Sequence, residues 1–369
     1  MIERYEEIIV ELGSRSYPVR IGNGISTAIG AELNKLKAGN KIGIVTDENV
    51  AKLYLKPIVD SLESAGFDVT SLTIPPGEAS KSLSVISDLY DTFLNNRFER
   101  NSTILSLGGG VVGDVAGFAA ATLLRGVNYI QLPTTLLAQV DSSVGGKVGI
   151  NHSKGKNLIG AFYQPKAVII DTDFLLTLPQ REIHCGMAEV IKYGLILDSE
   201  FTDFISDNFP ALPDDKHNEF LGRIIKRCVE LKAEVVRVDE KENDYRRILN
   251  FGHTVGHGVE AIVPRGSITH GEAIAFGMKA AVRLSERLGL LNSDAAAKAL
   301  RLLDSIPVHI SVKELDVEKI LDSMKSDKKV RDGEIHFVLL DKIGNTVIRS
   351  GIDEKMIKES IEKTQQAMQ

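Results

Sequence analysis

The chain has 369 residues, 43% of them hydrophobic and 25% charged, which is enough apolar material for two ordinary domain cores. Its 44 Lys and Arg against 50 Asp and Glu give a net charge of -6, which argues against nucleic acid as a partner. We find neither an apolar signal core nor a membrane span, and Cys185 and Cys228 are too few for a disulfide framework, so we expect a cytoplasmic protein with no membrane partner.

The first half of the chain alternates short apolar strands with helical patterns. Residues 8–12 and 17–21 predict an opening hairpin around a Gly-Ser-Arg-Ser turn. Further strands are predicted at 41–46, 67–74, 103–107, 127–132 and 167–170. Helix-length segments between most of these strands indicate a largely parallel sheet, so we predict an α/β domain over residues 1–178.

The second half is dominated by helical periodicity. Apolar residues recur with a 3.6-residue period at 181–197, 220–238, 248–262 and 272–288. A small hairpin is predicted from 335–340 and 346–348, and a terminal helix near 355–366. We therefore predict a mainly α-helical domain over residues 179–369.

A glycine-rich run, SLGGGVVGD at 106–114, follows one predicted strand and opens a helical stretch. Gly108, Gly110 and Gly113 match the G-x-G-x-x-G spacing of dinucleotide-binding loops. Glycines let the backbone approach a pyrophosphate, and a helix N-terminus offers free N–H groups. A tight strand-to-helix turn that binds nothing is the alternative.

Other nucleotide contacts are expected at the ends of neighbouring strands. No acidic residue follows the glycine run by about 20 residues, so the ribose ligands are expected in TDEN at 46–49. The turn PPGEASK at 75–81 offers a second contact. Thr134 and Thr135 follow another strand and suit pyrophosphate or nicotinamide contacts, although each of these segments is also compatible with an ordinary loop or an N-cap.

Two histidines lie one helical turn apart in NFGHTVGH at 250–257. His253 and His257 therefore share a helix face, a spacing that suits a metal or a phosphate. Thr254 stands where a zinc peptidase has its general base, so peptidase chemistry is disfavoured. The alternative is a surface or hydrogen-bonded core pair.

Glu189 lies in an otherwise apolar helical segment, HCGMAEVIKYG at 184–194, with Lys192 three residues later on the same face. A structural Glu/Lys pair is one interpretation. Glu with two histidines, drawn from His253, His257 and His270, is also a three-ligand set of the kind found in catalytic zinc sites.

Several motifs in one order resemble the 3-dehydroquinate synthase family. They are GGGVVGDVAG (108–117), LPTTLLAQVDSSVGGKVGIN (132–151), KNLIGAF (156–162), GMAEVIKYG (186–194), NFGHTVGH (250–257) and THGEAIAFG (269–277). The resemblance implies an α/β N-terminal Rossmann-like domain that binds NAD and a mainly α-helical C-terminal domain that binds Zn²⁺ or Co²⁺. It also implies a cytoplasmic homodimer.

The activity that the resemblance implies is a lyase reaction of the shikimate route to chorismate and the aromatic amino acids. 3-Deoxy-D-arabino-heptulosonate 7-phosphate is converted to 3-dehydroquinate and phosphate. The steps are transient oxidation by NAD, phosphate elimination, reduction, ring opening and intramolecular aldol closure. Lysines and arginines are expected to hold the phosphate and the carboxylate of the substrate.

The resemblance also assigns residues. It places the metal ligands at Glu189, His253 and His270, and a substrate-side histidine at His257. The substrate set is Arg125, Asp141, Lys147, Asn157, Lys192, Lys232, Arg246, Asn250 and Lys328, with Lys329 as the alternative to Lys328. The cofactor set is Asp47, Asn49, Glu78, Lys81, Gly109, Gly110, Asp114, Thr134, Thr135, Lys156 and Thr177.

Three other functions compete with this interpretation. Related sugar-phosphate cyclases make inosose or valiolone skeletons, and more distant polyol dehydrogenases share a two-domain organisation. A non-catalytic NAD- and metal-binding protein is the alternative from another class. The cations at 147, 192, 232, 246 and 328 favour a substrate with a carboxylate, which polyol oxidation does not require.

Overall fold

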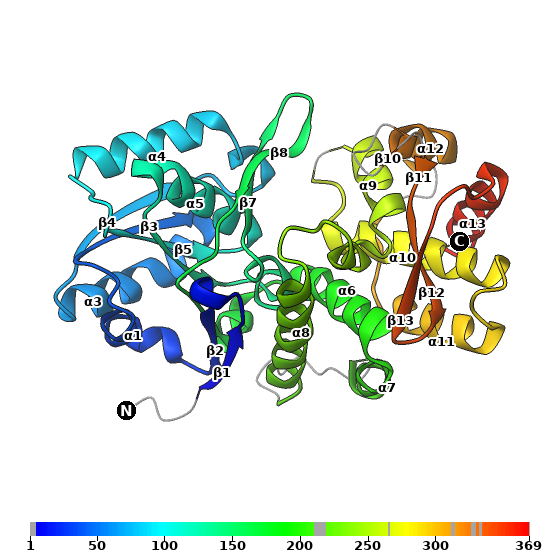
Figure 1. Cartoon of the computed structure of the whole chain (residues 1–369), viewed down its shortest axis with the longest axis horizontal. Coiled ribbons are helices and arrows are strands. Elements are labelled where there is room, and N and C mark those ends of the chain that lie inside the picture. The colour runs from blue at the N-terminus through cyan, green and yellow to red at the C-terminus, as the bar shows by residue number, and fades with distance from the viewer. Residues whose placement is uncertain are drawn as a thin grey trace. The chain divides into compact units, whose positions relative to one another are not determined.

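The computed structural model describes residues 5–209, 219–264, 266–310, 314–325, 330–331 and 334–368. The chain divides into two compact units (Figure 1). Unit 1 comprises Met1–Leu178 with Lys216–Lys241, and unit 2 comprises Pro179–Asp215 with Glu242–Gln369. The first segment of unit 1 ends at Leu178, and the helix α8 (Glu219–Val238), which lies within the predicted domain 179–369, belongs to unit 1.

Unit 1 is built on a seven-stranded sheet with the order β1-β2-β9-β6-β5-β3-β4. The strands are β1 (Glu6–Val10), β2 (Tyr17–Gly22), β3 (Lys41–Asp47), β4 (Asp68–Ile74), β5 (Thr103–Gly108), β6 (Asn128–Pro133) and β9 (Ala167–Asp171). β1 pairs antiparallel with β2, and all other pairs are parallel. The predicted hairpin and the five predicted parallel strands are confirmed.

Helices cover both faces of this sheet, as Figure 1 shows. The helices of unit 1 besides α8 are α1 (Ile29–Lys35), α2 (Glu48–Val50), α3 (Lys56–Ser64), α4 (Leu83–Asn95) and α5 (Gly110–Thr122). Successive side chains of a strand point to opposite faces. Accordingly, Val45 packs in the core cluster that contains residues of α4 and α5, whereas Ile44 packs in the cluster that contains residues of α1 and α3.

The strand order reverses between β3 and β5. β4 follows β3 in sequence and pairs with one edge of it, whereas β5 pairs with the other edge. In open α/β sheets, ligands bind outside the carboxyl ends of the strands at such a reversal. The carboxyl end of β3 is Asp47, and that of β5 is Gly108, so the glycine run begins at this point.

A second hairpin in unit 1, β7 (Lys147–His152) with β8 (Gly155–Phe162), was not predicted. Its backbones approach closely at glycines: a Cβ on Gly149 would lie 2.7 Å from the Ile159 carbonyl oxygen, and one on Gly160 would lie 2.4 Å from that of Val148. The buried side chains of Val148 and Ile150 join the core with α5. Glycine has low β-propensity, so the residue pattern of these two glycine-containing segments does not predict strands.

Unit 2 is mainly helical. Its helices are α6 (Gln180–Leu197), α7 (Ser199–Asn208), α9 (His253–Ile262), α10 (His270–Arg287), α11 (Ser293–Asp304), α12 (Val317–Lys325) and α13 (Glu354–Gln366). Two strand pairs accompany them, β10 (Val330–Arg331) with β11 (Glu334–Ile335) and β12 (Phe337–Lys342) with β13 (Asn345–Arg349). The predicted helical character, late hairpin and terminal helix are confirmed. Among the helices of the described ranges, none has the length and apolarity needed to cross a membrane.

One predicted helix of unit 2 begins later than expected. The periodicity at 248–262 predicted a continuous helix, but residues Tyr245–Asn250 form a 3₁₀ turn and α9 begins at His253. Gly252 between them has a φ of 78°, in the left-handed region that breaks a helix and suits glycine. The break makes His253 the first residue of α9.

Helix α10 contacts its neighbours through backbone atoms. A Cβ on Gly271 would lie 2.2 Å from the carbonyl oxygen of Cys185 on α6. A Cβ on Gly277 would lie 2.0 Å from the carbonyl oxygen of Gly252. Distances of this size leave no room for a side chain, so only glycine at these two positions allows α10 to lie against α6 and the start of α9.

We therefore expect Gly277→Ala to destabilise the protein, because the added methyl group must push α10 away from α9. Overpacking of this kind typically costs about 1–3 kcal/mol. The measurement is the Tm by differential scanning calorimetry. Gly222→Ala on α8 is the control, since nothing lies within 4 Å of its Cβ position and a Tm that is equal or slightly higher is expected. A wild-type Tm for Gly277→Ala would contradict the packing argument.

Candidate functional site

The predicted cofactor residues of unit 1 gather at the carboxyl ends of its parallel strands. Asp47 ends β3 and Gly109 follows β5, on the two sides of the reversal in strand order. Thr134 and Thr135 follow β6. The segment with Glu78 and Lys81 follows β4, and Thr177 lies in the turn after β9. The structure thus brings to one sheet edge residues that are spread over 130 positions of sequence.

The glycine run forms a tight connection from β5 into α5. Gly109 is the N-cap of α5 and Gly110 is its first residue. A Cβ on Gly109 would lie 3.0 Å from Cγ2 of Thr135, and one on Gly110 would lie 3.1 Å from Oγ of Ser142. Glycine at these two positions therefore leaves room for the side chains of Thr135 and Ser142. The first N–H groups of the 13-residue helix α5 point out of its N-terminus toward the sheet edge.

Two buried hydroxyls at this edge have no hydrogen-bond partner among the described residues, Oγ1 of Thr46 and Oγ1 of Thr134. A buried hydroxyl without a partner is costly and needs an explanation such as a bound ligand. A polar cofactor bound at the sheet edge would supply a hydrogen-bond partner for both hydroxyls. Thr135 differs, because its Oγ1 accepts the N–H of Ala138 at 3.2 Å as an N-cap does. Asp47 likewise accepts the N–H of Asn49 at 2.8 Å.

Lys81 is the centre of a polar network near α5. Its Nζ donates to Oδ2 of Asp114 at 2.6 Å and to Oδ1 of Asn157, and it lies 3.7 Å from Oε1 of Glu78. Lys81 is only 5% exposed. Burial raises the pKa of Asp114, and the charge of Lys81 opposes that shift. The buried ammonium of Lys81 therefore contacts two predicted cofactor residues, Glu78 and Asp114, and one predicted substrate residue, Asn157.

A second buried lysine in unit 1 pairs with another predicted substrate residue. Nζ of Lys232 on α8 donates both to the carbonyl oxygen and to Oδ1 of Asp141, each at 2.6 Å. Lys147 and Lys156 lie exposed on the β7–β8 hairpin. Thr177 shares a hydrogen bond of 2.5 Å with the hydroxyl of Tyr54.

Arg125 lies in an unusual backbone segment. Leu124, Arg125 and Gly126 have φ values of 51°, 67° and 119°, three consecutive residues in the positive range. For the leucine and the arginine this conformation is unfavourable, and such strain persists mainly where surrounding structure imposes it. The side chain of Arg125 is exposed.

In unit 2 the structure brings together the three residues assigned as metal ligands. Glu189 on α6, His253 on α9 and His270 on α10 each offer an atom that lies within 4.8 Å of the others. Oε1 of Glu189 is 3.7 Å from Nε2 of His253 and 3.6 Å from Nε2 of His270. Two ligand atoms about 2.1 Å from a tetrahedral zinc lie about 3.4 Å apart, so the cluster fits one divalent ion.

The remaining ring nitrogens of both histidines face acceptors. Nδ1 of His253 lies 3.1 Å from the carbonyl oxygen of Phe251, and Nδ1 of His270 lies 3.5 Å from Oε1 of Glu260. This arrangement puts the proton on Nδ1 and directs the Nε2 lone pair at the metal position. Burial opposes charging of His270, but Glu189 and Glu260 raise its pKa to about 10. Metal binding must therefore displace a proton from His270, and the affinity of the cluster for the metal should rise with pH.

The other predicted residues of unit 2 lie on the helices that carry this cluster or in the turn before α9. Lys192 contacts Oε2 of Glu189, so the predicted Glu/Lys pair is present together with the ligand geometry. The ring centroid of His257 lies 5.4 Å from that of His253, which confirms their shared helix face. Asn250 donates to Oε1 of Glu242 at 2.8 Å, and Arg246 is 2% exposed. Lys328 and Lys329 lie outside the described residues.

Two residues beside the cluster, Glu260 and Glu272, are outside the predicted set of site residues. Glu260 follows His257 by three positions, a helical spacing that could have pointed to it. Glu272 forms a capping box with Thr269 at the start of α10, and Arg181 donates to both of its carboxylate oxygens, at 3.0 and 2.7 Å. The T-x-x-E spacing at 269–272 is the sequence signature of this box.

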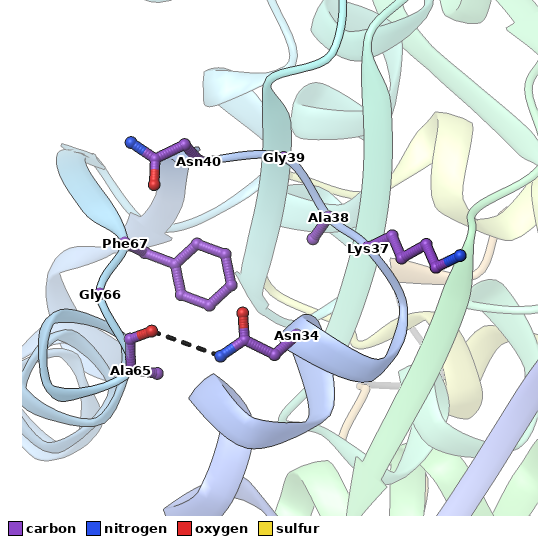
Figure 2. Close-up of a pocket in the computed structure, with 8 residues that line it drawn as sticks. All are labelled: Asn34, Lys37, Ala38, Gly39, Asn40, Ala65, Gly66 and Phe67. Atoms are coloured by element: carbon purple, nitrogen blue, oxygen red, sulfur yellow. Dashed lines mark hydrogen bonds between the residues drawn. The ribbon is translucent and has the colours of Figure 1, made fainter.

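One pocket and the two cysteines are not part of the predicted site. An open pocket of about 380 Å³ lies at the amino ends of β3 and β4, lined by residues 34, 37–40 and 65–67, and contains none of the predicted site residues (Figure 2).

Both cysteines are buried, and burial raises the pKa of the Cys185 thiol to about 12. Because both thiols are shielded from solvent, we assign neither cysteine a nucleophilic role.

Comparisons with known proteins agree with this geometry. The family model of the 3-dehydroquinate synthase N-terminal domain matches residues 71–185, and that of the C-terminal domain matches residues 186–330. A curated 3-dehydroquinate synthase of Rippkaea orientalis (strain PCC 8801 / RF-1) is 44% identical over 357 residues, which cover 95% of this chain and 96% of the relative.

Solved structures of two related cyclases also match. A 2-deoxy-scyllo-inosose synthase complexed with carbaglucose-6-phosphate, NAD⁺ and Co²⁺ is 28% identical, with a TM-score of 0.87 over 98% of this chain and 99% of that one. A 2-epi-5-epi-valiolone synthase from Streptomyces hygroscopicus subsp. jinggangensis 5008, with NAD⁺ and Zn²⁺ bound, is 25% identical, with a TM-score of 0.86 over 100% and 99%. The two family models, the curated relative and the three-ligand cluster agree, and the chain belongs to the 3-dehydroquinate synthase family.

Proposed function

We propose that this protein converts 3-deoxy-D-arabino-heptulosonate 7-phosphate to 3-dehydroquinate and phosphate, as a carbon–oxygen lyase dependent on NAD and on Zn²⁺ or Co²⁺. The observation that carries the proposal is the cluster of Glu189, His253 and His270 in a chain 44% identical to a 3-dehydroquinate synthase. The same family membership favours a cytoplasmic homodimer.

When bound, NAD would accept and return a hydride, and the divalent ion would act as a Lewis acid toward a substrate oxygen. Glu189, His253 and His270 would hold the ion through one carboxylate oxygen and two Nε2 atoms. Gly110 and the N-terminus of α5 would hold the pyrophosphate of NAD through backbone N–H groups. The unpartnered hydroxyl of Thr134 would donate to or accept from the cofactor.

The proposed substrate residues supply positive charge in an acidic protein. Lys192 and Arg246, 1% and 2% exposed, are buried cations of unit 2 that would bind the anionic groups of a phosphorylated keto acid. Lys147 and Arg125 of unit 1 are exposed and would bind the same kind of group. Asn157, Asn250, His257, Asp141 and Lys232 complete the proposed set, with Lys328 or Lys329 as a further cation.

The related cyclases are the strongest competing proposal, since their substrates are also sugar phosphates. Identity of 44% to a 3-dehydroquinate synthase against 28% and 25% to the inosose and valiolone synthases favours the dehydroquinate reaction. Polyol dehydrogenases do not require cations for a substrate carboxylate. A non-catalytic binding protein would not require a buried Lys192 beside the metal ligands.

Phosphate release tests the proposed function directly. The purified protein is mixed with NAD, Zn²⁺ and the heptulosonate phosphate, and free phosphate and 3-dehydroquinate are measured together. Equal amounts of the two products are expected. No phosphate from this substrate, but phosphate from another sugar phosphate such as glucose 6-phosphate, would assign the chain to the competing cyclases. No phosphate from any of them would indicate a binding protein.

We expect His270→Ala to lose the metal and the activity together, because two ligands cannot replace the three-ligand set. Bound zinc is measured by mass spectrometry after desalting. His309→Ala is the matched control, a 59% exposed histidine of unit 2 outside the cluster that should keep full zinc content. Full occupancy in His270→Ala would remove this residue from the site.

We expect Gly110→Val to abolish NAD binding on calorimetric titration, because the side chain occupies the path of the pyrophosphate. The same side chain would also approach Ser142, whose Oγ is 3.1 Å from the Cβ position. The double variant Gly110→Val/Ser142→Ala removes that internal contact. Recovery of NAD affinity in the double variant, or unchanged affinity in the single one, would contradict the proposed position of the pyrophosphate.

We expect Lys147→Met to reduce kcat/KM by roughly 30-fold or more while NAD and zinc affinity are kept, because loss of one partner of a bound anion typically costs about 2–5 kcal/mol. Methionine keeps most of the apolar stem. Lys154→Met, in the turn of the same hairpin, is the matched control and should have wild-type kinetics. A kcat/KM within twofold of wild type would make Lys147 a surface residue, and loss of NAD would move it to the cofactor site.

A further inference from the structure

Asn151 lies at an irregular point of the β7–β8 hairpin. The pairing of β7 with β8 shifts register between Ile150 and His152, so Asn151 is left out of the regular ladder. Such irregularities re-aim a residue away from the partner strand. The backbone N–H of Asn151 donates instead to the carbonyl oxygen of Lys81 at 2.9 Å. The hairpin is thereby joined to the segment that follows β4.

The side chain of Asn151 connects two residues to which we assigned ligand contacts. Its Nδ2 donates to Oε1 of Glu78 at 2.8 Å. Its Oδ1 accepts the backbone N–H of Asn157 at 2.9 Å, and Asn157 has a φ of 54°, a conformation that needs support from its surroundings. One short amide therefore contacts both the β4 segment and the far strand of the hairpin.

These contacts close into a ring. Lys81 donates to the side chain of Asn157, Asn157 donates to Asn151, and Asn151 donates to Glu78, which lies 3.7 Å from Lys81. A closed polar network restricts the rotamers of each member, so less conformational freedom remains to be lost on ligand binding. The amide of Asn151 offers a donor to the carboxylate and an acceptor to the N–H on two separate atoms, Nδ2 and Oδ1.

We propose that Asn151 is a positioning residue that holds Glu78 and Asn157 in the arrangement needed to bind NAD. The proposal rests on the cofactor and substrate roles given above to Glu78, Lys81 and Asn157. Asn151 itself acts through these neighbours. Asn151→Asp changes only the contact with Glu78. The new carboxylate still accepts the N–H of Asn157, but it turns a second carboxylate toward Glu78 where Asn151 presents an N–H donor.

A double-mutant cycle on NAD affinity tests the proposal. The four proteins are wild type, Asn151→Asp, Glu78→Gln and the double variant, each titrated with NAD by calorimetry. Asn151→Asp should weaken NAD binding by at least tenfold. In the Glu78→Gln background the same change should cost at least fivefold less, because the glutamine Nε2 can donate to the new carboxylate and restore the link with reversed polarity.

Stability measurements separate positioning from a merely structural role. Asn34→Asp is the control, since the Asn34 side chain donates to the Ala65 carbonyl oxygen at 3.3 Å at the amino ends of the strands, as Figure 2 shows. It should alter Tm without altering NAD affinity. If Asn151→Asp does not fold, Asn151→Ser is used, which loses the link to Glu78 without adding charge and should also weaken NAD binding.

Two results would overturn the proposal while leaving the proposed function intact. One is wild-type NAD affinity in a folded Asn151 variant. The other is an equal loss of affinity from Asn151→Asp in the wild-type and the Glu78→Gln backgrounds, which would show that the two side chains act independently. Failure of the wild-type protein to bind NAD would instead contradict the proposed function itself.

Discussion

The backbone contacts of helix α10 are the constraint on which the proposed metal site depends. Gly271 lies against α6 and Gly277 lies against Gly252 at the start of α9, each with no space for a Cβ. Three helices that each carry one ligand can converge only if their backbones approach this closely. The ligand atoms of Glu189, His253 and His270 consequently meet within 4.8 Å, although 64 and 17 positions of sequence separate them. The site is thus a product of helix packing and not of a local motif.

In unit 1 the corresponding constraint is the order of the parallel strands. Because all their carboxyl ends meet at one edge, the glycine turn after β5, the hydroxyls after β6 and the polar turn after β4 become neighbours. The β7–β8 hairpin adds Asn157 to this set through Lys81 and Asn151. Rigid strands therefore place groups that loops alone would leave mobile, which is how such sheets preorganise a nucleotide site.

Buried lysines recur in both units, each beside a carboxylate. Lys81 pairs with Asp114, Lys232 with Asp141, and Lys192 with Glu189. Burying such pairs seldom increases stability, because desolvation of both charges offsets their attraction. We propose that these three pairs serve ligand binding, since a cation held in a dry environment binds an anionic ligand more strongly than one in water.

The sequence by itself determined the parallel strands, the glycine turn, the helical second half, the family and the shared helix face of His253 and His257, because all of these are set by local periodicity or by contiguous motifs. Only the tertiary structure decided that the ladder of β7 and β8 forms between glycine-rich strands, and that α9 starts at His253 after a left-handed Gly252. Only it placed Glu260 beside His270 and Asn151 between Glu78 and Asn157. Those contacts join residues on different elements, and their energies depend on backbone positions that no local pattern encodes.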